Sequence, residues 1–586
     1  MGAPPAVAAV TRGRYVERPV PRLVRWPLSV LATLGAPTSR ILESWRGATY
    51  EGPPPACEPD GRAVELRGTA FPGDARTYRQ VPFEVRPGTA RLEISYSFEP
   101  LGPTLPDNPV TQTVFDLGLW DEQGYRDARG FRGWSGSRHR TIFVEADRAE
   151  RCYRPGPINP GIWYVELGFA AVGPTGAEWT VTVRAFSGPS RPPPTPDPVD
   201  AAHVANPEPG WYHGDFHMHA YHSNPKGPTR ERFVEWARLA HLDFTPVTEY
   251  VVGLHWDQYG QAQRENRDLV IWPGREIITY FGHMQCLGET PGFIEYRHGF
   301  EDVHVRDIQS RVRSAGALFQ VNHPTTFAGS LFSRVCRGCA FELGDEIEWD
   351  EVDTIEVLNQ AAVVRKKLLR GGYVEIENPF MGSAIRLWES KLNDGYRITA
   401  VSGSDAKLGK GLGSSATAVF AEQLSRHALI EAIRAGRAYI RTLGVADSPE
   451  LNMTVTAADG QAGTFGSRLV VEVGGEVQVT VAVKGGSGQW LRVIRNGAEL
   501  DVVRVTSDEF SHDFTARRVA REHGLDTWYR VETFDDRSRT TIGNPVYLGP
   551  LRPAPPRPLP LARRPVDRAR RNVRGLLSAR SLAGEG

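Results

Sequence analysis

The segment LVIWPGREIITYFGH (Leu269–His283) holds two apolar runs, and each run ends at a side chain of a type that binds hard divalent metals. Glu276 ends the first run and His283 ends the second. In a parallel βα barrel the ends of the strands face one mouth, so side chains that end successive strands converge there. A glutamate at the end of a buried strand would leave the apolar sheet by pointing into that mouth. The segment therefore predicts a barrel with two candidate metal ligands.

The same pattern recurs on both sides of this segment. Two histidines that are two positions apart, His217 and His219, share one face if the chain is extended there, and they would present two nitrogens to one cation. Each of these polar endings by itself is more often a satisfied structural group, but six of them in order predict a metal site and hydrolytic chemistry. The further runs are GDFHMH (214–219), ALFQVNH (317–323, ending at His323) and ITAVSGSD (398–405, ending at Asp405).

Residues 211–445 alternate apolar runs with segments of helical pattern, which favours βα units around a mostly parallel sheet or barrel. The expected helices are Thr229–Leu242, Val305–Gly316, Ser383–Gly395 and Ser425–Gly436.

The flanking regions have a different pattern. Residues 61–188 and 446–550 show period-two alternation divided by Gly and Pro, which predicts a β-sandwich on each side of the barrel. Residues 189–210 are a Pro-rich linker, 1–60 a Pro- and Arg-rich arm, and 551–586 a basic tail that we expect to be disordered.

The composition excludes several classes of function. Lys+Arg and Asp+Glu both total 69, so no net field draws the chain to nucleic acid or to a membrane surface. No apolar stretch is long enough to span a membrane. The five cysteines are too few and too scattered for a disulfide framework. We expect a cytoplasmic protein; the alternative is secretion, with residues 26–36 as the apolar part of a signal sequence.

Over residues 211–410 the sequence resembles the PHP (polymerase and histidinol phosphatase) family, and more narrowly its CehA/McbA, or carbaryl hydrolase-like, branch. The resemblance implies a distorted (β/α)7 barrel between two sandwiches. It implies one metal held by His217, His219, Glu276 and Asp405, and a neighbouring metal held by Glu276, His283 and His323. The segments that carry the resemblance are GDFHMH, LDFTPVTEY, GREIITYFGH, ALFQVNHP, DTIEVLN and AVSGSD, with RGWSG, WYRVE and NPVYL in the sandwiches.

The sequence departs from this family pattern at three positions that help to hold a third metal. They are Asn224, Tyr250 and Lys407, and Glu249 stands where the family carries an aspartate. A carbonyl, a phenol and an ammonium do not make a cation site. Our hypothesis is that Lys407 replaces the charge of the third ion and contacts the developing oxyanion or the leaving group, with Tyr250 as a hydrogen-bond donor. The alternative is a decayed site.

These observations predict a metal-dependent hydrolase that uses two divalent ions, which would be zinc, manganese or iron. Asp405 or Glu249 would accept the proton of the attacking water. The substrate would be a small molecule with a phosphoester, carboxylic ester or carbamate bond. The alternative is a non-catalytic binding or scaffold protein with a degenerate barrel. Neither the exact substrate nor any protein partner follows from the sequence. Candidate substrate contacts are Arg275, Asn322, Asn359 and Lys226, although an ordinary polar group in solvent or behind a ligand is the favoured interpretation of each.

Overall fold

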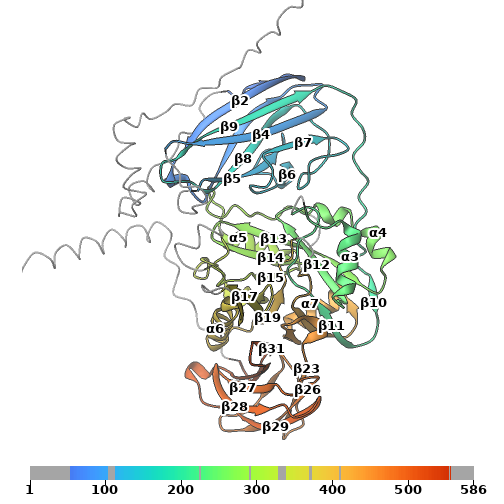
Figure 1. Ribbon diagram of the computed structural model, residues 1–586, viewed down its shortest axis with the longest axis vertical. Helices are drawn as coiled ribbons and strands as arrows, with labels where there is room; N and C mark the ends of the chain where they lie inside the picture. Colours follow the sequence, from blue (N-terminus) through green and yellow to red (C-terminus); the bar gives the residue numbers. More distant parts are fainter. Residues whose placement is uncertain are drawn as a thin grey trace, which may run out of the picture.

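The computed structural model describes residues 53–102, 112–223, 226–288, 292–327, 338–367, 372–407, 411–553 and 555. Most of the predicted N-terminal arm and almost all of the basic tail lie outside these residues. The described chain forms three units, which Figure 1 draws one above the other: a sandwich, a central α/β unit and a second sandwich. None of the described helices is long and apolar enough to cross a membrane.

The N-terminal unit consists of two antiparallel sheets that enclose a core of their own. The strands alternate buried and exposed side chains, as in β4, where Leu92, Ile94 and Tyr96 are buried. The core of this unit includes Trp163 and Trp179, which are buried between the two sheets. One sheet has the order β1 (Ala56–Cys57), β3 (Thr77–Val85), β8 (Gly161–Ala171), β5 (Val114–Trp120), β6 (Phe131–Trp134), with β1 and β3 parallel; the other has the order β2 (Asp60–Ala70), β9 (Ala177–Phe186), β4 (Arg91–Pro100), β7 (Thr141–Glu145).

The central unit is built on a mixed sheet rather than a purely parallel one. Strands β11, β12 and β13 are parallel, β13, β14 and β15 are antiparallel, and β15, β16 and β19 are parallel again. The antiparallel part exists because β13 turns directly into β14 as a hairpin. The strands are β11 (Gly210–Gly214), β12 (Phe244–Tyr250), β13 (Val270–Thr279), β14 (Gly282–Leu287), β15 (Leu318–Val321), β16 (Thr354–Asn359) and β19 (Thr399–Gly403).

The first and last of these strands meet through a few backbone contacts. The amide of Phe216 donates to the carbonyl of Ser402 at 3.3 Å, and Met218 bridges to Ala406 in parallel. These contacts bring the segments that follow β11 and β19 together without a regular β11–β19 strand pair among the described residues. The closed, distorted (β/α)7 barrel therefore stays a prediction.

Helices cover the outside of this sheet at the places where the pattern predicts them (Figure 1). Three begin at side-chain caps. Thr229 accepts from the Arg232 amide before α3, and Ser425 accepts from the Ala428 amide before α7. Asn378 accepts from the Phe380 amide before α6, with Pro379 in the first turn. The helices are α3 (Arg230–Leu239), α4 (Gly260–Glu265), α5 (Val305–Ser314), α6 (Pro379–Asn393), α7 (Arg426–Arg434) and the short α8 (Gly444–Asp447).

Smaller strands complete the central unit. The linker ends in β10, which pairs with β21, and the hairpin of β17 and β18 precedes α6. Strands β20 and β22 extend the main sheet beyond β11. The bounds are β10 (Val204–Asn206), β17 (Val363–Lys367), β18 (Tyr373–Glu377), β20 (Ala416–Ala421), β21 (Leu424–Ser425) and β22 (Ala438–Arg441).

The C-terminal unit shares this sheet. Strand β22 pairs with β31, so the ladder passes without a break from the central unit into the second sandwich. The facing sheet has the order β24, β23, β26, β29. The bounds are β23 (Glu450–Ala457), β24 (Ala462–Gly463), β25 (Arg468–Val470), β26 (Glu476–Lys484), β27 (Trp490–Arg495), β28 (Ala498–Arg504), β29 (Glu509–Arg517), β30 (Thr527–Phe534), β31 (Arg539–Gly543) and β32 (Val546–Gly549).

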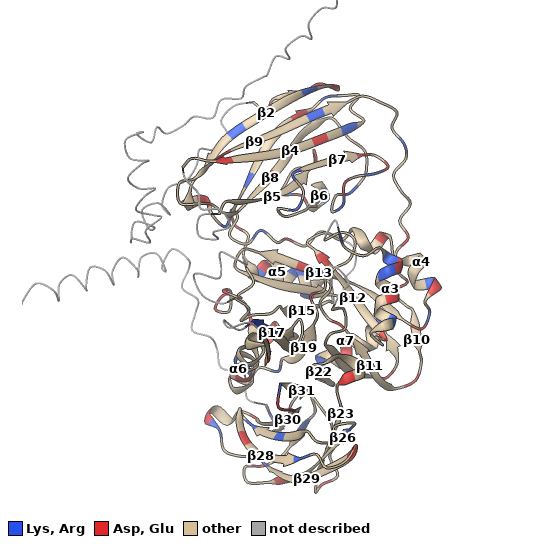
Figure 2. Cartoon of the chain, in the orientation of Figure 1, with Lys and Arg blue, Asp and Glu red and all other residues tan. Residues whose placement is uncertain are grey.

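One hydrophobic core joins all three units. It contains Trp134 of the first sandwich, Ile277 and Phe319 of the central unit, and Trp528 of the second sandwich. Figure 2 shows positive and negative residues interspersed over the three units, in keeping with the balanced composition.

Candidate metal centre

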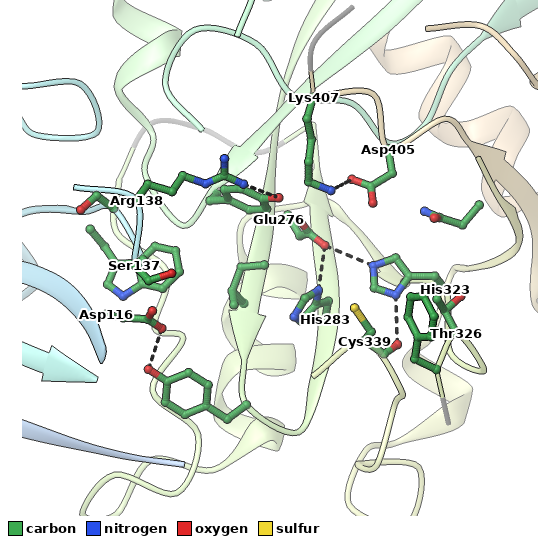
Figure 3. A pocket seen from close by; sticks show the side chains of 18 of the residues that line it. Asp116, Ser137, Arg138, Glu276, His283, His323, Thr326, Cys339, Asp405 and Lys407 are labelled. Atoms are coloured by element: carbon green, nitrogen blue, oxygen red, sulfur yellow. Dashed lines mark hydrogen bonds and ion pairs between the residues drawn. The ribbon is translucent and has the colours of Figure 1, made fainter. Parts of the chain in front are cut away.

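The six predicted ligands lie together in one buried cluster around the carboxylate of Glu276, and Figure 3 shows four of them. Glu276 Oε1 is 3.1 Å from His283 Nδ1 and 3.4 Å from His217 Nε2. It is 3.5 Å from His323 Nε2, while Oε2 is 3.3 Å from His219 Nε2. Asp405 Oδ1 lies 3.1 Å from His219 Nε2 and 3.4 Å from His217 Nε2.

Within this cluster three overlapping groups have ligand atoms close enough together to hold an ion. They are His217, His323 and Asp405; His217, His219 and Glu276; and Glu276, His283 and His323. Six side chains from separate parts of the chain thus form a buried group of histidines and carboxylates that could bind metal ions.

The hairpin of β13 and β14 positions two of the ligands. Sequence analysis placed Glu276 and His283 at strand ends, but Glu276 lies inside β13, because that strand continues to Thr279 and turns back at Gly282. Glu276 pairs with Gln285, so His283 is two residues along β14 and on the same face. The pleat of the sheet, not a strand end, brings these two side chains together.

The two histidines of the HxH motif follow β11 instead of lying in it, since β11 ends at Gly214. Their segment runs beside the end of β19. The amide of Asp405 donates to the carbonyl of His217 at 2.7 Å, and the amide of His219 donates to the carbonyl of Ala406 at 2.9 Å. These backbone bonds place Asp405 beside both imidazoles.

Asp215 connects the segment that follows β11 with the segment that follows β19, and this role was not predicted from the sequence. One of its oxygens accepts the amides of His217 at 3.2 Å and Ser404 at 2.9 Å, and the other accepts the amide of Gly413 at 3.0 Å. Gly403 is required here for space, because a Cβ at this position would lie 2.3 Å from the Cβ of His217. The small residues before Asp405 leave room for His217 itself.

Glu356 of β16 also borders the cluster and was not predicted from the sequence. It is fully buried, and both of its oxygens are 3.3 Å from His217 Nδ1. It also accepts the amide of His323 at 2.8 Å and the side-chain amide of Asn359 at 3.0 Å. The signal was present in TIEVLN, where a carboxylate interrupts an otherwise buried strand.

The orientation of the imidazoles suits a metal. Both oxygens of Glu356 lie 3.3 Å from Nδ1 of His217, so Nε2 faces Glu276 and Asp405 at 3.4 Å and is the nitrogen that could bind a metal. His323 likewise turns Nδ1 to the carbonyl of Cys339 at 3.1 Å and Nε2 to Glu276. Metal-bound histidines are commonly oriented by a carboxylate or a carbonyl in this way.

The charges in the cluster also call for a cation. Burial acts to raise the pKa of Glu276, but the imidazoles of His217 and His283 outweigh it and hold the pKa well below its usual value. Burial acts to lower the pKa of His217, but Glu276 and Glu356 outweigh it and raise that pKa well above the ordinary one. The imidazoles thus supply the positive charge that keeps the buried carboxylate ionised, a role that a metal ion could take over.

Two of the predicted ligands have a left-handed backbone, which strains a histidine but is tolerated by an aspartate. His323 has φ 26° and Asp405 has φ 49°, both in the left-handed region that residues other than Gly, Asn and Asp rarely adopt. Each residue stands two positions after the end of its strand, β15 or β19. Strain of this kind collects at functional sites, where the surrounding structure holds it in place.

Besides Asp405, three residues were predicted to take part in chemistry, and they occupy different places. Lys407 Nζ is 2.6 Å from Asp405 Oδ1, and the Tyr250 ring lies 4.2 Å from the His219 ring, so both border the cluster. Glu249 faces away from it: its two oxygens accept the amides of His222 at 3.0 Å and Ser223 at 2.7 Å. These contacts make Glu249 a positioning residue for the loop after the HxH motif.

The other candidates have structural contacts. Asn224 lies outside the described residues. Arg275 is buried and donates to the carbonyls of Val251 and Gly292 at 3.0 and 2.6 Å. Asn322 donates to Glu276 Oε1 at 3.2 Å and so orients the central carboxylate. Asn359 borders the open side of the cluster while donating to Glu356.

A cavity of about 330 Å³ opens onto the cluster, and the N-terminal sandwich supplies part of its wall. Figure 3 shows Asp116, Ser137 and Arg138 from that unit facing Glu276 and His283 across the cavity. Tyr280 ties the two units together by donating from its hydroxyl to Asp116 at 2.8 Å. Sequence analysis did not predict this composite wall. The sandwich residues in it are Asp116, Trp134, Ser135, Gly136, Ser137 and Arg138.

No protein-family model matches this sequence, and no curated protein matches it. Among solved structures, the lesion-specific endonuclease PfuEndoQ from Pyrococcus furiosus is similar to part of the chain, with 13% identity and a TM-score of 0.25. The similarity covers 40% of this chain and 58% of the endonuclease. The CARDB domain of PF1109 from the same organism is similar at 15% identity, with a TM-score of 0.12, over 17% of this chain and 96% of that domain.

Proposed function

We propose that this chain is a metal-dependent hydrolase of the PHP type, in its CehA/McbA branch, with a distorted (β/α)7 barrel as its central unit. The observation that carries the proposal is the gathering of four imidazoles and two carboxylates around Glu276, at distances between 3.1 and 3.5 Å. Residues far apart in the chain meet there, buried and at the bottom of a cavity. Nitrogen and oxygen ligands of this kind suit zinc, manganese or iron.

We divide the ligands between two divalent ions. His217, His219, Glu276 and Asp405 would hold one ion, and Glu276, His283 and His323 would hold the other. The central position of Glu276 supports its place in both sets, because Oε1 lies near His283, His323 and His217 while Oε2 lies near His219. When bound, two such ions supply Lewis acidity and a nucleophilic water near neutral pH.

The protein's own groups would then bind and orient the substrate. The Lys407 ammonium sits at the rim of the cluster beside Asp405, where it can hydrogen-bond to an oxyanion or a leaving group. The Tyr250 hydroxyl also faces the cavity and offers a second donor. Asp405 is the proton acceptor in this scheme, since Glu249 has both oxygens engaged by backbone amides. Glu356 keeps His217 in one orientation.

The scheme fits a phosphoester, a carboxylic ester or a carbamate as the bond that is cleaved. The second candidate is a binding or scaffold protein with a degenerate site. One observation favours it: Lys407 is a fixed cation only 2.6 Å from a ligand carboxylate, so it competes with a metal for Asp405.

Metal content and hydrolysis separate the two candidates. The full chain would be loaded with zinc, manganese or iron, dialysed, and measured by elemental analysis, together with a screen of phosphate, acetate and carbamate esters. We expect two ions per chain and hydrolysis of one ester class. His217→Ala should lose metal and activity, whereas His427→Ala, which replaces an exposed histidine on α7, should keep both.

Three outcomes would count against the proposal. Hydrolysis that survives His217→Ala would come from another site or a contaminant. Bound metal without turnover of any ester class would favour the binding protein. Three tightly bound ions per chain would contradict the idea that Lys407 stands in for the third.

A further inference from the structure

The cavity has two walls that come from different units of the chain. The central unit supplies the ligand cluster, Tyr250 and Lys407, while the segment Trp134–Arg138 after β6 supplies the opposite side. The first wall carries the groups that could do chemistry. The second wall lies where the part of a substrate that does not react would sit.

Arg138 is the cation of this second wall, and Figure 3 shows it beside the cavity. Its guanidinium carbon is 5.3 Å from the centre of the Tyr250 ring, and Nη2 lies 3.5 Å from the Tyr250 hydroxyl, at the limit of a hydrogen bond. In the part of the chain that the structure describes, Arg138 forms no ion pair with a carboxylate. Its charge and most of its five donors therefore remain available to a ligand.

The neighbouring Arg140 does not line the cavity, so position along the chain and not charge alone makes Arg138 available to a ligand. Arg140 lies two residues further along the same segment, but its guanidinium stacks on Tyr96 and Phe98 at 4.7 and 4.5 Å. Those rings belong to β4, within the sandwich. Arg140 thus has the same charge and similar exposure without reaching the cavity.

A second cavity of about 410 Å³ lies between the central unit and the C-terminal sandwich, and its arginines also differ from Arg138. It is lined by four arginines, and each one is paired with a carboxylate. Each guanidinium thus already has a carboxylate partner, although two of them share Asp526. The pairs are Arg397 and Arg468 with Asp526, Arg434 with Asp353, and Arg437 with Glu422.

The groups beside Arg138 extend in a row from the ligand cluster. The Tyr250 ring lies 4.2 Å from the His219 ring, and the Tyr250 hydroxyl lies next to Arg138. Lys407 is closer to the cluster, with its Nζ bound to Asp405 and 5.9 Å from the Tyr250 ring. Arg138 therefore stands about one tyrosine side chain away from the metal ligands.

We propose that Arg138 forms an anion-binding subsite, with Tyr250 and Lys407, that selects substrates bearing a second negatively charged group beyond the bond that is cleaved. The inference rests on the proposed function, since it deepens the substrate class of the same site. A guanidinium recognises a carboxylate or a phosphate through paired hydrogen bonds, which an ammonium cannot reproduce. The N-terminal sandwich is then the specificity module of the hydrolase.

Binding of matched phosphonates tests the subsite without requiring turnover. Phenylphosphonate is compared with its 3-carboxy and 4-carboxy derivatives by calorimetry on the metal-loaded full chain. The phosphonate addresses the metal cluster, and the added carboxylate can reach Arg138. We expect at least one carboxylated probe to bind about tenfold more tightly than phenylphosphonate, as a charged hydrogen bond allows.

The variants should separate Arg138 from its surroundings. Arg138→Gln should abolish the preference while changing phenylphosphonate binding by less than about twofold, and Arg138→Lys should keep only part of it. Arg140→Gln should bind all three probes like the wild type. A sulfonate-bearing analogue, 4-sulfophenylphosphonate, shows whether a tetrahedral anion is preferred over the planar carboxylate.

The outcomes distinguish this inference from the function on which it rests. A preference that persists in Arg138→Gln, a wild type that shows no preference, or a wild type that binds none of the probes overturns the subsite. A preference that depends on Arg138, in a protein that hydrolyses no ester, supports the subsite and refutes the hydrolase. Hydrolysis without any preference refutes the subsite alone.

Discussion

The two sandwiches flank the same central unit but are attached to it differently. The C-terminal sandwich continues the central sheet, since β22 and β31 share a backbone ladder. The strands of the N-terminal sandwich form sheets of their own among the described residues. That unit is held by side chains: Arg297 binds the buried Glu166 at 3.2 Å, and Tyr78 stacks on Tyr280 with ring centres 4.9 Å apart.

The two sandwiches also differ in whether they line the cavity beside the candidate metal ligands. Residues of the N-terminal sandwich line it, and those of the C-terminal sandwich do not among the residues described. A backbone ladder fixes two units rigidly, because every strand position contributes to it. A side-chain interface can change residue by residue without disturbing a sheet. We infer that the C-terminal sandwich supports the fold and that the N-terminal sandwich shapes the site.

If the sandwiches only support the fold and shape the cavity, the groups that bind metal and cleave the substrate must belong to the central unit. Glu276→Gln keeps the size of the central ligand and removes its charge, so we expect loss of bound metal and a fall in hydrolysis of at least about 10³-fold. Metal content and initial rates measure this. Glu431→Gln, on the exposed face of α7, is the matched control. If Glu276→Gln retained both metal and rate, the site would have to lie elsewhere.

The buried ion pairs of the C-terminal sandwich should affect stability and not chemistry. Arg530 is 2% exposed and lies 2.7 Å from both Glu389 and Glu532. Arg530→Met leaves these carboxylates short of their partner, so the free energy of unfolding should fall by about 3 kcal/mol or more. Urea unfolding measures this against the exposed Arg537→Met. A lower rate per folded molecule would contradict the division of roles.

The same pairs should make the C-terminal sandwich sensitive to acid. Burial acts to raise the pKa of Glu532, but Arg530 and Arg539 outweigh it and lower the pKa from 4.5 to about 2. A depressed carboxyl pKa stabilises the fold above the unfolded value, and that stability is lost as the pH falls from about 4.5 towards 2. The loss should approach about 3 kcal/mol. Urea unfolding across this range should show a flatter profile in Glu532→Gln; an identical profile would contradict the assignment.

The carboxylate behind His217 should act on metal affinity more than on folding. Glu356→Gln cannot hold the imidazole in the same way, so affinity for the metal should fall by about 10–100-fold. Competition with a chelator measures this. Glu375→Gln, on the exposed strand β18, should have no effect. Unchanged affinity in Glu356→Gln would show that His217 needs no such support.

The smallest effect is expected at the side-chain interface of the N-terminal sandwich. Tyr280→Phe removes the hydroxyl that donates to Asp116, and it should lower the free energy of unfolding by about 1 kcal/mol. Both residues line the cavity, so KM should change while kcat does not. Tyr373→Phe, at an exposed position, is the control. A change in kcat without any change in KM would show that this wall does more than shape the cavity.

Much of the fold follows from local patterns. The alternation in residues such as Leu92, Ile94 and Tyr96 marks strands, because one face of each is buried. The mixed character of the central sheet could not be predicted, because the apolar runs around Glu276 and His283 look the same whether the second strand is parallel or returns as a hairpin.

The sequence by itself determined which side chains could hold a metal, because His217, His219, Glu276, His283, His323 and Asp405 stand beside or within apolar runs where an unpartnered polar group would be costly. Only the tertiary structure decided that Glu356, 139 positions from His217, supports it, and that Arg138 faces the cluster from another unit. Periodicity reports the face on which a residue lies. It contains no information about which distant element will cover that face, since this depends on how whole sheets pack.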